Sequence, residues 1–255
     1  MAFVLVMPNL LQAQRGRGGT DQVPRPARVA APTDLTGYWV SLITEDWRFR
    51  MKSGRRGEID RTAIPLNARG LKVAESWDPD RDVAQGLECK AYGAAGIMRI
   101  PGRLHITWTD DNTLRIDTDA GKQTRILRFG AAWPPAGELT WQGHSVARWD
   151  FPSSAPRGEA VADALGGQQG GHGQLVVVTT SMRSGYYFRL DGIPYSEKAV
   201  MTEYFTRVKE DNGAEYLLVT IFVDDPEYLV QPYIRTVHFK REPDGSKWNP
   251  RPCTP

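Results

Sequence analysis

Strict alternation of apolar and polar residues marks several short segments of this chain. Residues 104–108 and 114–118 alternate in this way, and the Asp-Asp-Asn sequence at 110–112 between them is typical of a tight turn. A second turn at 120–121 leads into residues 123–129. Because successive side chains of a strand point to opposite faces, such alternation indicates half-buried strands. The pattern therefore predicts a three-stranded antiparallel meander.

Strand-like segments rich in aromatic and β-branched residues continue along the rest of the chain. The first lies at residues 37–43, ahead of the meander. Two short helices are predicted between them, at 67–74 and 82–91, with Asp82 as the N-cap of the second. The remaining strand-like segments lie at residues 144–149, 175–181, 200–208, 216–224 and 234–241.

Many short strands without the spacing of βαβ units predict a mainly β protein. The predicted helices are too few to cover a parallel sheet. We therefore expect an antiparallel, lipocalin-like barrel or a strongly curved sheet, with one or two short helices. Closure of the barrel would remove exposed sheet edges, which an exported monomer needs to avoid aggregation.

The ends of the chain and one internal segment differ from this pattern. Residues 1–14 are largely apolar and end on a small residue before a polar segment, as a secretory signal peptide does. Residues 15–33 are rich in Gly, Pro and Arg and predict a disordered linker. Residues 34–255 are predicted to form a single β-barrel domain, with a flexible insertion at 150–173. We thus expect an exported protein, periplasmic or extracellular.

Composition and charge exclude several classes of protein. The 255 residues carry 32 Lys and Arg against 30 Asp and Glu, a net charge of +2, which provides no field for nucleic-acid binding. No apolar run approaches the roughly 20 residues that span a bilayer, so stable membrane insertion is not expected. The chain also lacks GxSxG, HExxH, P-loop and GxGxxG motifs. A small-molecule ligand or substrate remains as the expected partner, without a cofactor.

Cys89 and Cys253 are the only cysteines in the chain. Without a CxxC pair, a zinc knuckle or a thioredoxin motif is excluded. In an oxidising compartment, the expected use of two cysteines is one disulfide. It would attach the C-terminal tail to the region around Cys89.

Polar residues on the predicted strands are the candidates for acid–base chemistry. His105 and Asp117 lie on adjacent strands, and Arg125 follows on the third, so a suitable register would bring them together. Glu203 stands out because Met201 and Phe205 share its face, and His238 is a further candidate base. The catalytic candidates are therefore His105, Asp117, Arg125, Glu203 and His238.

Two interpretations of these residues remain open, and a metal site is a third. The charged face of the meander is either solvated, with the apolar face filling the barrel, or it lines a ligand cavity. A set made of His105, His144, His238 and Glu203 has suitable ligand types but no spacing signature, and no metal ligand is assigned. Aromatic and polar residues that would line a cavity for an apolar molecule are Trp39, Trp108, Trp141, His144 and Tyr195.

Several short phrases together resemble a family of uncharacterised exported proteins of acidobacterial and soil-bacterial type. The resemblance covers roughly residues 34–255 and implies a secreted, lipocalin-like domain without supplying a reaction. The phrases are DLTGYW (34–39), EDW (45–47), RIPGRLHITW (99–108), DTDAG (117–121), QTR (123–125), WQGHSVARW (141–149), GIPYSE (192–197), DPEYL (225–229) and HFK (238–240).

The sequence supports two hypotheses of function. The first is an exported barrel that holds a small, mainly apolar molecule. The second is a cofactor-independent acid–base enzyme on the same barrel, an isomerase, lyase or hydrolase. Convergence of His105, Asp117, Arg125 and Glu203 in one cavity would distinguish the second from the first.

Overall fold

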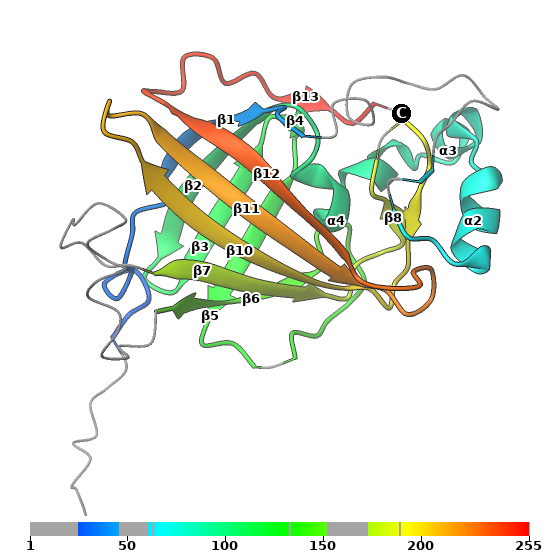
Figure 1. Ribbon diagram of the computed structural model, residues 1–255, viewed down its shortest axis with the longest axis horizontal. Helices are drawn as coiled ribbons and strands as arrows, with labels where there is room; N and C mark the ends of the chain where they lie inside the picture. The colour runs from blue at the N-terminus through cyan, green and yellow to red at the C-terminus, as the bar shows by residue number, and fades with distance from the viewer. Residues whose placement is uncertain are drawn as a thin grey trace, which may run out of the picture.

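Nine strands of the protein close into a barrel (Figure 1). The computed structural model describes residues 25–45, 61–62, 64–132, 134–151, 173–188 and 190–254. Neighbouring strands are antiparallel except β5 and β6, which are parallel, so the predicted mainly β, antiparallel barrel is confirmed. In their order around the barrel, the strands are β1 (Gly37–Leu42), β12 (Tyr233–Glu242), β11 (Glu215–Asp224), β10 (Val200–Lys209), β7 (Gln174–Thr180), β6 (His144–Asp150), β5 (Thr124–Phe129), β3 (Thr113–Thr118) and β2 (Arg103–Asp110).

Short helices gather at one end of the barrel, on the right in Figure 1. They are α2 (Ala68–Glu75), α3 (Pro79–Ala84), the 3₁₀ helix η1 (Glu88–Tyr92) and α4 (Ala94–Ile97). Two small strand pairs accompany them: β8 (Gly185–Tyr186) with β9 (Pro194–Tyr195), and β4 (Ala120–Gly121) with β13 (Arg251–Pro252). No helix in the described part of the chain is long and apolar enough to cross a membrane.

The first predicted helix is confirmed as α2, but the second is displaced. Asp78, not Asp82, is the N-cap of α3: its side chain accepts hydrogen bonds from the next turn, and Pro79 begins the helix. Gly86 follows with a φ of 67°, which favours glycine and ends the helix. The predicted span 82–91 is therefore divided between the end of α3 and η1.

Large apolar side chains fill the interior of the barrel. Strand alternation places Leu104 and Ile106 inside, and His105 outside, where it is the direct cross-strand partner of Asp117. Trp39, Phe205 and Phe239 are each at most 1% exposed. The barrel is therefore a packed core rather than an open channel.

An aromatic cluster closes the end of the barrel opposite the helices. The rings of Trp108, Phe129 and Trp149 lie 5.4–6.5 Å apart, centroid to centroid. The indole N–H of Trp149 donates to the carbonyl of Ala27 at 2.7 Å, and the Ala27 amide donates to Asn112 at 2.8 Å. Residues 25–33, which the linker prediction included, thus form an ordered segment against this end. Residues 1–24 and 152–172, and with them most of the predicted signal, linker and insertion, lie outside the described residues.

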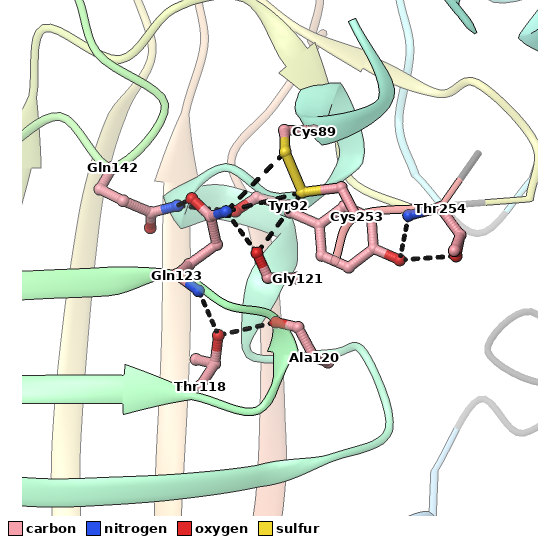
Figure 2. The surroundings of a disulfide bond; sticks show 9 residues. All are labelled: Cys89, Tyr92, Thr118, Ala120, Gly121, Gln123, Gln142, Cys253 and Thr254. Carbon is pink, nitrogen blue, oxygen red and sulfur yellow. Dashed lines mark hydrogen bonds between the residues drawn. A yellow bond between two sulfur atoms is a disulfide. The ribbon is translucent and has the colours of Figure 1, made fainter. Parts of the chain in front are cut away.

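The expected disulfide joins Cys89 in η1 to Cys253, beyond β13 (Figure 2). The side-chain amide of Gln123 donates to the carbonyl of Gly121 at 2.7 Å and lies 3.6 Å from the Cys253 sulfur. Beside it, the hydroxyl of Tyr92 lies 3.0 Å from that of Thr254. The C-terminal tail is therefore fixed to the helical end of the barrel, as predicted.

Candidate functional site

A buried ion pair lies inside the barrel. Two guanidinium nitrogens of Arg125, on β5, donate to the two carboxylate oxygens of Glu203, on β10, at 2.8 and 2.5 Å. Both side chains are fully buried. This bidentate geometry is the strongest form of arginine–carboxylate contact and fixes both groups in orientation.

The pair reaches across two intervening strands. Strands β5 and β10 are three positions apart, about 14 Å along a flat sheet at the usual strand spacing. Three inward-facing residues on the strands between them are small: Ser145 and Ala147 on β6 and Thr179 on β7. Barrel curvature and these short side chains leave space for the arginine and the glutamate to meet.

Two hydroxyls extend the ion pair into a larger polar cluster. Arg125 also donates to the hydroxyl of Thr179 at 3.5 Å, and this hydroxyl shares a hydrogen bond of 2.7 Å with Ser145. Ser145 and Thr179 are direct cross-strand partners. We call Arg125, Glu203, Thr179 and Ser145 the interior polar group.

The interior polar group offers a hydrogen bond that the chain itself does not use. The Nε–H of Arg125 is buried and has no acceptor among the described residues. A buried donor without an acceptor costs roughly 1–3 kcal/mol, so such positions in native proteins are commonly satisfied by a water or a ligand. The cluster can therefore receive a further acceptor atom.

Two methionines lie beside the interior polar group on its helical side. Met201 is the direct cross-strand partner of Thr179, two residues from Glu203 on the same strand face. Met182 also lies near Thr179, since both side chains approach the same side of Gly143. Both methionines are fully buried. Unbranched, polarisable methionine side chains repack more easily than branched ones, so the core is most adaptable here.

The predicted cluster of His105, Asp117 and Arg125 does not form. The cross-strand partner of Arg125 is Ile116, whereas that of Asp117 is Thr124, so Arg125 points inward and Asp117 outward. Asp117 pairs instead with Arg115, at 2.8 Å, on the outer face. Of the two interpretations of the meander, the solvated charged face therefore describes this structure. The prediction that Arg125 lies on that face with His105 and Asp117 is wrong, because Arg125 points into the barrel.

The three described histidines of the candidate set also lie apart from the interior. His105 stacks on Tyr38 outside the barrel, with ring centroids 4.1 Å apart. His238 lies 2.9 Å from the Thr44 hydroxyl and 3.4 Å from the Glu45 carboxylate. His144 lies 2.9 Å from the carbonyl of Glu138. These histidines do not meet Glu203, and no group of three potential metal ligands occurs among the described residues.

The aromatic candidates occupy different environments. Trp39 belongs to the core, and its indole N–H donates to the carbonyl of Leu35 at 3.0 Å. Trp108 belongs to the aromatic cluster at the far end, and Trp141 lies 4.4 Å beneath the guanidinium of Arg183. They therefore do not surround one common space.

Tyr195 lies at the helical end within a group of buried tyrosines. Its ring centroid is 5.5 Å from that of Tyr187, which is 5.3 Å from Tyr233. Burial raises the pKa of Tyr195 and of Tyr187 well above the usual value, so both hydroxyls remain protonated. Neither hydroxyl has a hydrogen-bond partner among the described residues. Both could therefore bond to a ligand at the helical end of the core, where the two methionines lie.

Sequence reasoning identified Arg125 and Glu203 but missed the two hydroxyls. Thr179 shares its strand face with Leu175 and Val177, the same signal that singled out Glu203. Ser145 has a weaker signal, because a small residue inside a barrel does not by itself indicate polar contact.

Comparison with known proteins gives no relative from which a role could be transferred. No protein-family model, no curated protein and no solved structure matches this chain. Functional inference therefore rests on the geometry of the interior polar group and on the chemistry of its surroundings.

Proposed function

We propose that this protein is an exported small-molecule-binding barrel whose ligand contacts the interior polar group. The observation that carries the proposal is a fully buried, bidentate Arg125–Glu203 pair with an unused Nε–H beside two hydroxyls. Removing two charges from water costs several kcal/mol per ion in a protein, and apolar replacements of such pairs are often neutral or stabilising. Stability alone therefore gives little reason for the pair, whereas a ligand anchor does.

The chemistry of the site selects a mainly apolar ligand with a hydrogen-bond acceptor. Leu127, Phe205 and Ile221 are among the apolar residues that fill the barrel interior around the cluster. Glu203 already neutralises Arg125, so a second full negative charge would be left without a counter-ion. A neutral carbonyl or amide oxygen on an aliphatic body matches both the unused donor and its apolar surroundings.

Binding requires some of the core to repack, because side chains fill the interior. Met182 and Met201 are the side chains beside Thr179 that adapt most easily. They lie toward the helical end, where short helices rather than continuous strands cover the barrel (Figure 1). We infer that the ligand displaces these methionines and enters from that end.

Export is supported by two independent observations. The disulfide between Cys89 and Cys253 is typical of an oxidising compartment. The apolar segment at residues 1–14 has the character of a signal peptide. An exported barrel would bind its ligand in the periplasm or outside the cell.

The acid–base enzyme has no comparable support. It needs a histidine near the Arg125–Glu203 pair, but His105 and His238 lie on the outer face of the barrel. The five catalytic candidates are divided between the two sides of the barrel wall: Arg125 and Glu203 lie inside, and the other three lie outside.

Thermal unfolding in the presence of defined probes tests the proposal. Octanamide and octan-2-one carry a carbonyl acceptor on an aliphatic chain, and n-octane is the matched probe without one. Because a ligand that binds the folded state stabilises it, the carbonyl probes should raise the melting temperature in proportion to the logarithm of their concentration, more than octane does.

Two double variants separate the interior site from a nonspecific effect. Arg125→Met/Glu203→Met removes the interior anchor and should abolish the difference between octanamide and octane. Arg115→Met/Asp117→Asn removes the exposed ion pair on the outer face and should leave the difference unchanged. The proposal would be contradicted if the difference in melting-temperature shift between octanamide and octane were the same in both variants. It would also be contradicted if neither carbonyl probe raised the melting temperature of the natural protein.

A further inference from the structure

A shallow groove lies on the helical layer, outside the barrel. It is open to solvent, and its walls come from the connection between α2 and α3, from α3 itself, from η1 and from β8. Trp77 and Tyr186 form its aromatic part, with ring centroids 6.5 Å apart at 78°. Asp82, Glu88 and Lys90 supply its charged groups.

Three of these side chains are held in fixed positions by one another. The Tyr186 hydroxyl donates to Asp82 at 2.6 Å, and the Lys90 ammonium lies 3.2 Å from the other carboxylate oxygen of Asp82. The same ammonium lies 4.9 Å from the centroid of the Tyr186 ring. Burial and the bond to Asp82 raise the pKa of Tyr186, so its hydroxyl remains a donor. Asp82, Tyr186 and Lys90 therefore form a preorganised wall.

Two groups of the groove remain available to a ligand. The half-buried Glu88 carboxylate makes no hydrogen bond or ion pair with any residue that the structure describes. The half-buried Trp77 lines the groove with its ring system, which offers apolar contact. A ligand that lies over the groove thus meets both an apolar aromatic surface and a carboxylate acceptor.

The charges of the groove decide what kind of ligand fits. A quaternary ammonium would suit Trp and Tyr rings. The Lys90 ammonium, however, already lies over the Tyr186 ring and would repel a second cation. An anion would be repelled by Glu88. A neutral ring with an apolar C–H face and several hydroxyls meets neither obstacle, because hydroxyls donate to carboxylates and accept from ammonium groups.

We propose that this groove is a surface subsite for a single neutral sugar ring, which stacks on Trp77 and donates hydroxyl hydrogen bonds to Glu88. The subsite is independent of the barrel interior and of the ligand proposed there. Two features of the fold maintain it. The disulfide at Cys89 fixes the segment that carries Glu88 and Lys90, and Gly192, with a φ of 65°, allows the backbone to lie directly against Trp77.

Saturation-transfer NMR on the full chain with methyl glycosides of glucose, galactose, xylose and N-acetylglucosamine tests the proposal. At least one glycoside should bind saturably with a millimolar dissociation constant, as expected for a shallow site. Trp77→Ala should weaken this binding at least about tenfold, and the nearly isosteric Glu88→Gln about threefold. Trp248→Ala is the matched control, since Trp248 packs on the Tyr38 and His105 rings, away from the groove, and should not change binding.

The outcomes separate a sugar site from other occupants. Saturable binding that Trp77→Ala and Glu88→Gln weaken and Trp248→Ala does not supports the proposal, and a folded Trp77→Ala that binds normally overturns it. If Trp77→Ala fails to fold, the Glu88→Gln result decides. The absence of saturable binding by all four glycosides overturns it. It is also overturned if tetramethylammonium binds and competes at the groove while the glycosides do not, or if Glu88→Gln leaves glycoside binding unchanged.

Discussion

Arg125 and Glu203 meet inside the barrel although strands β6 and β7 lie between the strands that carry them. Small residues on β6 and β7 leave the space through which the two long side chains reach each other. A contact of this kind couples four consecutive strands through side chains, in addition to their backbone hydrogen bonds. The pair is therefore both the proposed ligand anchor and a constraint on how this part of the barrel packs.

Breaking the ion pair on one side should be strongly destabilising. Arg125→Met leaves the Glu203 carboxylate buried without its counter-ion, which should lower the free energy of unfolding by about 3–5 kcal/mol. Denaturant unfolding, followed by tryptophan fluorescence, measures the change. Arg115→Met is the exposed control and should cost less than about 1 kcal/mol, because its partner Asp117 lies on the solvated face.

Removing both charges together should restore most of the loss. In Arg125→Met/Glu203→Met no buried charge remains, so the double variant should be within about 1–2 kcal/mol of the natural protein. A double variant less stable than Arg125→Met alone would show that the charges are needed for folding, and would remove the reason for assigning them to a ligand.

The disulfide should contribute substantially to stability. Cys89 and Cys253 are 164 residues apart in sequence, so their bond restricts a long loop of the unfolded chain. Cys89→Ser/Cys253→Ser should lower the free energy of unfolding by about 2–5 kcal/mol. Non-reducing peptide mapping must recover the two cysteines of the natural protein as one linked peptide. Recovery of both as free thiols would refute the bond and weaken the argument for export.

Asp191 should make stability depend on pH near neutrality. Burial raises the pKa of its carboxyl to about 7 from its usual value of 3.8. Between these values the folded state retains a proton that the unfolded state has lost, so its extra stability is complete below pH 3.8 and is lost as the pH rises to about 7. Above pH 7 the contribution of Asp191 to the free energy of unfolding no longer changes with pH.

The variant Asp191→Asn tests this assignment, since asparagine keeps the shape of the protonated acid without titrating. Unfolding free energies measured across the same window should show a shallower fall with pH than in the natural protein. They should also be higher than those of the natural protein above pH 7. Parallel pH profiles for the two proteins would show that Asp191 is ionised in the fold throughout.

Gly192 should tolerate no side chain. Its φ of 65° favours glycine, and a Cβ there would collide with Trp77. Gly192→Ala should therefore cost about 2–4 kcal/mol in unfolding free energy. Gly213 is the matched control: its φ is 82° but a Cβ meets no atom within 4 Å, so Gly213→Ala should cost only about 1 kcal/mol of backbone strain. Equal losses of unfolding free energy in the two variants would mean that the Trp77 side chain moves away from the added methyl group.

Strand alternation predicted the barrel strands closely, because burial of one face imposes a period of two along each strand. The same rule explains the misplacement of Arg125. Continuing the charged face of Asp117 across the turn at Ala120–Gly121 put Arg125 outside, whereas Leu127 and Phe129 share its face and indicated the interior. The buried position of Glu203 was predicted correctly, because its neighbours on both sides were compared. The bond between them could not be predicted, since it depends on the order of strands around the barrel, which no local pattern contains.

The groove on the helical layer also lay beyond sequence reasoning. Trp77 and Tyr186 are 109 positions apart in sequence and approach each other because both β8 and α3, which follows Trp77, pack on η1. The cysteine pair was predictable for the opposite reason: two cysteines allow a single pairing.

Native mass spectrometry of the full chain, purified from its own compartment without denaturation, tests the central claim most directly. The natural protein should retain a small molecule of defined mass, which is released on unfolding. Arg125→Met/Glu203→Met, prepared identically and shown to be folded, should retain none, while Arg115→Met/Asp117→Asn should retain it. A natural protein that carries no ligand and binds neither octanamide nor octan-2-one, or a folded interior variant that retains the same molecule, would contradict the account.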